Sequence, residues 1–189
     1  MNTEINEKIF EEFPIMESSR LLFRNFSIKD AHEMLILRSD SQVMEFLDIN
    51  KYESLQDAEK MIVRVRDSFS AKSGINWAIA DRSTKIFMGY FGFWRLFPEQ
   101  CRAEIGYSLM PKYWSKGYMT ETLSRMIDFA FHDLQVHSIE ANVNPKNSRS
   151  IALLEKAHFK KEAYFRENYL YNGRFYDSVI YVLLETDQY

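Results

Sequence analysis

The stretch that most constrains this chain is PKYWSKGYMTE at residues 111–121, a turn with one glycine that leads directly into an amphipathic helix. A strand-like run at residues 102–109 precedes it, so the local order is strand, turn, helix. Such a turn leaves several backbone N–H groups without an intrahelical acceptor, and the positive end of the helix dipole lies behind them. The pattern indicates an anion cradle and suits a pyrophosphate. Many helices begin after a glycine and bind nothing, so the pattern alone does not identify a ligand.

Length and composition indicate one domain in the cytoplasm. A chain of 189 residues is long enough to bury roughly 70% of its unfolded surface. The single Cys101 excludes an internal disulfide and has no neighbouring histidine that would activate it. There is no charged-then-apolar leader and no run of about 18 apolar residues, so we expect neither secretion nor a membrane. The 24 basic against 27 acidic residues give a net charge of −3, so we also expect no nucleic-acid partner.

The hydrophobic pattern predicts an α+β fold, a mixed sheet with helices on its faces. Ser27 and Ser54 each precede an aspartate by three residues, which is typical of a helix start. The strand, helix and strand around residues 102–143 predict a crossover connection. We expect residues 1–18 to be an N-terminal extension with a short helix, and residues 19–189 to be a single domain. The expected strands are residues 21–26, 77–80, 86–94, 102–109, 138–143, 163–171 and 175–184, and the expected helices are residues 27–39, 54–69, 117–134 and 147–157.

Three local motifs occur in a fixed order, AEIGY at residues 103–107, YWSKGY at 113–118 and NSRSIALLEKAHF at 147–159. Together they resemble the GCN5-related N-acetyltransferase (GNAT) superfamily, and within it the ribosomal-protein N-terminal (alanine/serine) acetyltransferases. The resemblance extends over about residues 19–184. It implies a GNAT-type mixed, splayed β-sheet flanked by helices on both faces, and an N-acetyltransferase that uses acetyl-CoA as co-substrate and no metal.

The resemblance also implies which residues bind acetyl-CoA. Main-chain groups near Leu109 and Met110 would pair with the pantetheine arm in the manner of a missing strand, and Asn147 would bond to the same arm. The alternatives are an ordinary strand end for Leu109 and Met110, and a helix cap for Asn147. The loop amides that would hold the pyrophosphate are those of Ser115, Lys116, Gly117, Tyr118, Met119 and Thr120.

Transfer to an amine requires a base that accepts a proton and an acid that meets the leaving thiolate. Glu104 is the candidate base, because it lies two residues before Gly106 on the strand that would end at the thioester. A salt-bridged surface carboxylate is the alternative. Ser150 is the candidate donor to the sulfur, and its alternative is a serine that bonds its own backbone. Many superfamily members have a tyrosine where this chain has Leu154, which moves the acid role to Ser150 or to solvent.

Some positions depart from the superfamily pattern. Trp114 and Ser115 replace the more usual basic residue and glycine. Met119 stands where a small residue lets the helix start approach the pyrophosphate, although a methionine side chain bends readily. His158 replaces the glycine that ends the last helix in a left-handed conformation, at a cost of about 1 kcal/mol. The four histidines lack metal-ligand spacing, so no metal site is expected.

The resemblance favours the α-amine of a protein or peptide terminus as the acceptor. We expect an open groove between residues 43–47 and residues 169–174 that admits an extended chain. A small amine, such as a polyamine, an amino sugar or an amino acid, is the alternative acceptor, and a non-catalytic acyl-CoA-binding scaffold is the alternative to an enzyme. The aromatic residues at 91–97 predict an exposed surface for a homodimer contact. The carboxylates available for a polyamine are Asp48, Glu53 and Glu167.

Overall fold

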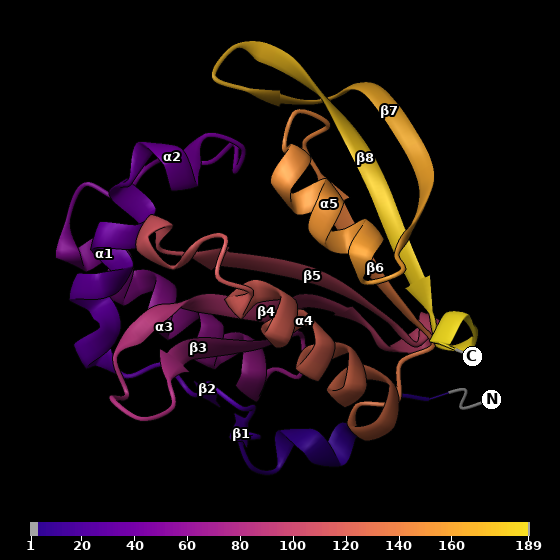
Figure 1. Ribbon diagram of the computed structural model, residues 1–189, viewed down its shortest axis with the longest axis horizontal. Helices are drawn as coiled ribbons and strands as arrows, with labels where there is room; N and C mark the ends of the chain where they lie inside the picture. Colours follow the sequence, from indigo (N-terminus) through magenta and orange to yellow (C-terminus); the bar gives the residue numbers. More distant parts are fainter. Residues whose placement is uncertain (1–3, 189) are drawn as a thin grey trace.

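In the computed structural model, which describes residues 4–188, eight strands form one sheet in the order β1-β2-β3-β4-β5-β6-β8-β7 (Figure 1). All neighbouring strands are antiparallel except β5 and β6, which are parallel. The expected α+β architecture and its crossover connection are confirmed. The strands are β1 (Met16–Glu17), β2 (Leu21–Arg24), β3 (Ile75–Asp81), β4 (Phe87–Phe97), β5 (Arg102–Leu109), β6 (Ser138–Val143), β7 (Lys160–Tyr171) and β8 (Arg174–Leu184).

Helices cover both faces of this sheet (Figure 1). Apolar side chains of α4 and α5 join one hydrophobic cluster, and those of α1 and α3 join a second cluster. No helix within residues 4–188 combines the length and the apolar character needed to cross a bilayer. The α-helices are α1 (Ala31–Ser39), α2 (Ser41–Met44), α3 (Leu55–Ser70), α4 (Tyr118–Asp128) and α5 (Ser148–Lys156), and the shorter turns are η1 (Glu7–Phe10), η2 (Ile28–Asp30), η3 (Pro98–Gln100), η4 (Pro111–Tyr113), the π-helical η5 (Phe129–Asp133) and η6 (Glu185–Gln188).

The helix starts follow the sequence closely. The expected capping boxes are present, with the Ser27 side chain paired with Asp30 and the Ser54 side chain with Asp57. One helix end differs from the prediction, because α4 continues as the π-helical turn η5 rather than as α-helix to residue 134. Three consecutive side chains of this turn are buried. These are Phe129, Ala130 and Phe131.

The sheet divides between β5 and β6. Their parallel ladder has three pairs and ends at Glu104 and Glu140, although β5 continues to Leu109 and β6 to Val143. Beyond this point β5 stays paired with β4 and β6 with β8, so the two halves of the sheet separate like a V. A register shift in β4 between Phe93 and Arg95, opposite the end of the ladder, bends the strand there. The splayed sheet is therefore confirmed.

The aromatic residues of β4 alternate between core and surface. Phe91 and Phe93 are completely buried, and the Trp77 ring lies 5.9 Å from that of Phe93. Trp94 points the other way and is 43% exposed. The expectation that the aromatic residues at 91–97 are exposed is wrong for Phe91 and Phe93, because successive strand side chains face opposite sides, and the homodimer contact stays a prediction.

The segment before β2 packs on the rest of the fold. Ile5 is buried, the Asn6 amide donates to the Leu134 carbonyl, and the Trp77 indole donates to the Pro14 carbonyl at 2.6 Å. The short helix expected here is the single turn η1. Residues 1–3 of the predicted extension lie outside the described residues, and its boundary at residue 18 stays a prediction.

Two glycines, Gly89 in β4 and Gly106 in β5, allow a matched test of how closely these strands pack against their neighbours. A Cβ at Gly89 would lie 2.1 Å from the Ser108 carbonyl oxygen, a backbone atom that cannot move aside. We expect Gly89→Ala to lower the free energy of unfolding in urea by about 1–3 kcal/mol. At Gly106 the nearest atom is Trp94 Cδ1 at 3.3 Å, on an exposed side chain that can turn. Gly106→Ala should cost clearly less, and equal losses would contradict this account.

Candidate functional site

A cleft of about 840 Å³ opens where β5 and β6 separate. Its walls come from the end of β5, the loop into α4, the end of β6 with the start of α5, and the residues in and after α2. This volume lies within the range of small-molecule sites, about 300–1,000 Å³. The unpaired edge of β5 faces this space, because β6 has turned away.

The loop into α4 has the geometry of an anion cradle. Ser115 (φ 58°) and Gly117 (φ 78°) both adopt left-handed backbone conformations, which turn neighbouring N–H groups toward one side. Within residues 4–188, no group accepts a hydrogen bond from the amides of residues 115–120. The first intrahelical bond runs from the Glu121 amide to the Gly117 carbonyl. Six consecutive donors therefore stand at the positive end of the α4 dipole.

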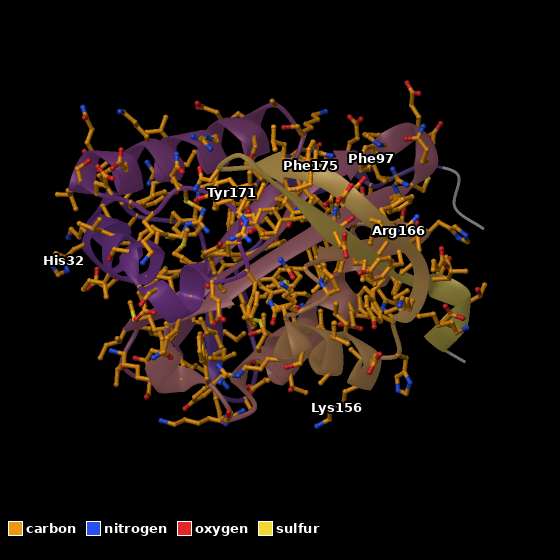
Figure 2. The ribbon with its side chains drawn as sticks, turned by 90° about the horizontal axis from the view of Figure 1, so that it is seen from above. His32, Phe97, Lys156, Arg166, Tyr171 and Phe175 are labelled. Carbon is orange, nitrogen blue, oxygen red and sulfur yellow. The ribbon has the colours of Figure 1, made fainter. Side chains whose placement is uncertain are left out.

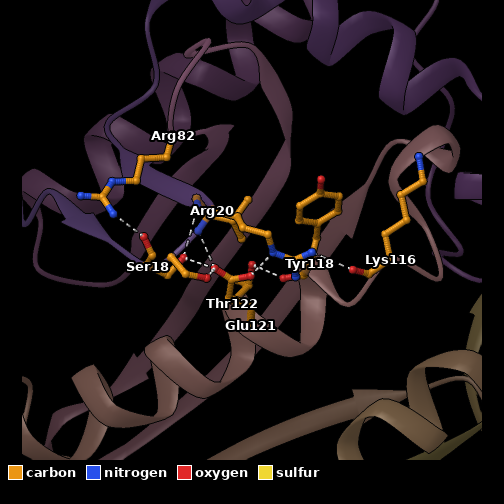
Figure 3. A network of polar contacts seen from close by, with 9 residues as sticks. Ser18, Arg20, Arg82, Lys116, Tyr118, Glu121 and Thr122 are labelled. Carbon is orange, nitrogen blue, oxygen red and sulfur yellow. Dashed lines mark hydrogen bonds and ion pairs between the residues drawn. The ribbon is translucent and has the colours of Figure 1, made fainter.

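A polar network fastens this loop to the start of β2 (Figure 3). The Glu121 carboxylate accepts hydrogen bonds from the hydroxyls of Ser18 (2.7 Å) and Ser19 (2.8 Å), and from the Arg20 amide (2.8 Å). Arg20 Nε pairs with the same carboxylate at 2.6 Å, and Arg20 Nη1 donates to the Lys116 carbonyl at 3.0 Å. The network joins residues about one hundred positions apart, and nothing in the sequence pattern indicated it.

Glu104 lies at the base of the V rather than in the wall of the cleft. It is buried, and its carboxylate lies 3.6 Å from Arg95 Nη1. Burial raises the pKa of Glu104, and the nearby Glu140 charge raises it further. The positive charges of Arg95 and Arg102 lower the pKa, but the net shift is upward. The alternative was a salt-bridged surface carboxylate. The ion pair with Arg95 is present, but Glu104 is buried and not on the surface.

Ser150 faces β5 across the cleft. Its Oγ lies 2.7 Å from the hydroxyl of Tyr107, and within the described range it makes no side-chain bond to its own backbone. The Asn147 side chain accepts from the Ser150 amide at 3.1 Å, which confirms the helix-cap alternative for Asn147. Burial raises the pKa of Tyr107 to about 12, and the hydrogen bond with Ser150 opposes that rise. Sequence reasoning missed Tyr107, because its partner lies 43 positions away.

The structure brings most, but not all, of the expected residues to the cleft. The Met110 amide already donates to the Met88 carbonyl, and the Leu109 carbonyl accepts from the Trp114 indole at 2.7 Å. Met110, Lys116 and Glu104 do not line the cleft. Those that do are Leu109, Ser115, Gly117, Tyr118, Met119, Thr120, Asn147 and Ser150.

The cleft wall carries several cations. Arg149 lies over the Trp114 ring at 4.8 Å, which places a cation beside the position where the sequence lacks a basic residue. Lys146 and Lys156 also line the cleft, and none of the three pairs with a carboxylate of residues 4–188. In the same range, no group of three or more His, Cys, Asp or Glu side chains is arranged to hold a metal ion.

Hydrogen bonds join the loop after α2 to the last hairpin, beside the groove expected between residues 43–47 and 169–174. Asp48 accepts hydrogen bonds from the Tyr169 hydroxyl and from Asn144 Nδ2, and the Tyr171 hydroxyl donates to Asn50 Oδ1 at 3.3 Å. The long hairpin of β7 and β8 extends past the sheet and carries Tyr171 toward its tip (Figure 2). Its length lets it reach Asp48 and Asn50 in the loop after α2, while residues 43 and 45–47 line the cleft, and the open groove for an extended chain stays a prediction.

The family follows from a direct comparison of the sequence. The profile of the family described as "Acetyltransferase (GNAT) domain" matches residues 20–160, more than half of the chain. The chain belongs to this family. It is therefore an N-acetyltransferase, and the resemblance seen in its three motifs is confirmed.

Relatives of this chain are also named as N-acetyltransferases. YoaA of Bacillus subtilis (strain 168), an uncharacterized N-acetyltransferase, is 34% identical over 173 residues, covering 92% of this chain and 98% of YoaA. The [ribosomal protein uS5]-alanine N-acetyltransferase of Escherichia coli (strain K12) is 36% identical over 83 residues, 44% of this chain and 43% of that protein. The spermidine N(1)-acetyltransferase of Vibrio cholerae is 22% identical over 161 residues, 85% and 90% of the two chains.

A solved structure of a GNAT-family acetyltransferase from Bacillus anthracis has the same fold. It superposes with a TM-score of 0.82 at 25% sequence identity, covering 92% of this chain and 99% of that chain. The helices on both faces of the splayed sheet are thus a shared feature of this GNAT enzyme and its structural neighbour.

The Glu121 network predicts a pH-dependent stability. Partial burial works to raise the pKa of Glu121, but hydrogen bonds from Ser18, the Arg20 amide, Ser19 and the Arg20 guanidinium lower it to about 2, below the ordinary 4.5. The carboxylate therefore stabilises the fold above about pH 4.5, and this contribution is lost as the pH falls toward 2. In urea unfolding, we expect the stability gap between wild type and Glu121→Gln to shrink over that interval.

A control separates this effect from a general loss of charge. Asp128→Asn removes a 59%-exposed carboxylate from the end of the same helix, where Arg125 and His132 are its ion-pair partners among residues 4–188. Its effect on stability should be small. A gap for Glu121→Gln that stays constant from neutral pH to pH 2 would contradict the lowered pKa.

Proposed function

We propose that this GNAT enzyme transfers an acetyl group from acetyl-CoA directly to the α-amine of a protein or peptide terminus. The observation that carries the cofactor part is the row of unpaired amides at residues 115–120, set at the mouth of the splayed cleft. Backbone donors at a helix N-terminus suit the diphosphate of coenzyme A. The unpaired Lys146, Arg149 and Lys156 add positive charge for the same polyanion.

Acetyl-CoA, when bound, supplies an acetyl group activated as a thioester. The exposed edge of β5 suits the pantetheine arm, because its main-chain groups there lack a neighbouring strand. Leu109 and Asn147 lie along this path, whereas the Met110 amide is already engaged with Met88. In this proposal the Met110 amide makes no hydrogen bond to the pantetheine arm.

Proton transfer is assigned to Glu104, at the base of the V, and to Ser150, in the cleft wall. Glu104 accepts the proton of the attacking amine, directly or through water, and its raised pKa suits a base that works near neutral pH. On the other side, Tyr107 stays protonated at neutral pH; either hydroxyl can donate in its hydrogen bond with Ser150, and this proposal takes Tyr107 as the donor to Ser150 Oγ. The Ser150 proton is then free to hydrogen-bond the departing sulfur.

The protein-terminal acceptor is supported by the Escherichia coli relative, whose name assigns it to an alanine of ribosomal protein uS5. The bridge from Asp48 to Tyr169 lies next to Leu47 and Asn144, which line the cleft, and in this proposal it borders the path of the acceptor. A chain terminus is thin enough to enter such a passage end first, whereas an internal lysine needs the flanking chain to pass alongside.

A small polycation is the second candidate acceptor. Within the described part of the chain, the groups that donate hydrogen bonds to Asp48 are uncharged, the Tyr169 hydroxyl and the Asn144 amide. In the same range no lysine or arginine pairs with it. Its charge is therefore left for an ammonium group. The Vibrio cholerae relative, named for spermidine, is consistent with this reading.

A thiol-release assay with acetyl-CoA tests the proposal. The acceptors are peptides that begin with alanine or serine, matched peptides with a blocked terminus and an internal lysine, spermidine, and an amino sugar. We expect the highest kcat/KM for the free-terminus peptides. Preference for spermidine would favour the second candidate, and coenzyme A binding without turnover of any amine would favour a non-catalytic scaffold.

Glu104→Gln tests the base. We expect kcat/KM to fall by about 100-fold or more while the Kd for coenzyme A stays unchanged, since the residue lies outside the cleft lining. In wild type, kcat/KM should fall on the acid side of a pKa above the ordinary 4.5 of a glutamate, and the variant should lose this limb. Glu99→Gln, an exposed carboxylate near the same strand, is the control. Equal activity of both variants would contradict the assignment.

A further inference from the structure

Arg20 makes three contacts with the segment that holds the free amides (Figure 3). Its Nε bonds Glu121 on the first turn of α4, its Nη1 donates to the Lys116 carbonyl at 3.0 Å, and its guanidinium lies 4.3 Å from the centre of the Tyr118 ring. A Cβ added to Gly117 would lie 3.5 Å from Arg20 Nη2. The Arg20 side chain, just before β2, thus contacts Lys116, Tyr118 and Glu121.

The bond to the Lys116 carbonyl fixes the direction of an amide. In a trans peptide the C=O and the N–H point to opposite sides. Because Arg20 holds the Lys116 oxygen on its own side, the N–H of Gly117 points away from Arg20. Gly117 also lines the cleft, whereas Lys116 does not. The orientation seen is therefore the one that presents this amide to an anion.

The loop has a means of losing this orientation. Gly117 has no Cβ and adopts positive and negative φ about equally well, so the peptide between Lys116 and Gly117 can turn over at little steric cost. Ser115 nearby is already in the left-handed region. A turned peptide would present the Lys116 carbonyl oxygen instead, and an oxygen repels phosphate.

Glu121 keeps Arg20 in place. Its carboxylate collects bonds from Ser18, Ser19 and the Arg20 amide as well as from the guanidinium, so the side chain is held from several directions. It is 15% exposed, while the Arg20 side chain is 44% exposed. Solvent screens the charge of Arg20 at that exposure, so its geometry matters more than its charge.

We propose that Arg20 is a positioning residue for coenzyme A. Arg20 holds the peptide between Lys116 and Gly117 so that the Gly117 amide points toward the diphosphate. The inference rests on the coenzyme A site proposed above. The residue just before β2, nearly one hundred positions away in the sequence, therefore helps to orient the phosphate-binding loop. Arg20 acts through the loop and makes no contact with the acetyl group.

Binding measurements on the whole chain test this without an acceptor. For Arg20→Ala we expect the Kd for coenzyme A, measured by calorimetry, to rise about tenfold, the effect of one lost hydrogen bond to a charged group. The Kd for pantetheine, which lacks the diphosphate and is titrated by NMR, should not change. Arg125→Ala is the matched control, since it removes an arginine paired with Asp128 on the same helix without touching the loop. It should leave both constants unchanged.

Arg20→Lys separates geometry from charge. A lysine keeps the charge but lacks the planar fork that bonds Glu121 and the Lys116 carbonyl together, so we expect it to bind coenzyme A as weakly as Arg20→Ala. Full affinity in Arg20→Lys or Arg20→Ala would overturn the inference. Equal weakening for coenzyme A and pantetheine would also overturn it, because it indicates general disruption. Wild type that binds pantetheine but not coenzyme A would overturn the proposed diphosphate site, and this inference with it.

Discussion

The parting of β5 from β6 after three residue pairs is the constraint on which the rest of the structure depends. While the ladder lasts, the strands satisfy each other's main-chain groups. Beyond Glu104 and Glu140 they do not, and both the cleft and the unpaired edge of β5 arise there. The crossover through α4 then places a helix N-terminus beside that edge. The bend in β4 opposite this point helps to hold the two halves apart.

The polar groups divide along this V according to their charge. Backbone donors and unpaired cations, such as Arg149, gather on the side of α4 and α5, where they suit a polyanion. The buried Glu104 lies at the base, and Asp48 stands at the opposite mouth under the last hairpin. In the proposed function, an acetyl carrier and an amine therefore approach the point where the strands part from regions of opposite charge. Tyr107 and Ser150 bridge the same point from opposite walls.

Local patterns in the sequence predicted much of the fold. Helix starts at Ser27 and Ser54, the strands β3 to β5, and the turn around Gly117 each depend on neighbours a few residues away, and each was confirmed. Contacts between distant segments were not predictable in this way. The Arg20 network, the bond between Tyr107 and Ser150 and the bridge over the acceptor groove depend on how strands lie side by side. Alternation predicts that only one face of residues 91–97 is exposed, but which face is buried depends on packing against distant segments, where Phe91 and Phe93 join the core.

The central claim is that the fold leaves the amides of residues 115–120 free for a diphosphate. A crystal structure of the chain with coenzyme A tests it most directly. The account predicts diphosphate oxygens about 2.7–3.2 Å from several of these nitrogens. A diphosphate bound elsewhere, or a loop whose amides are covered by the Met119 side chain, would contradict it.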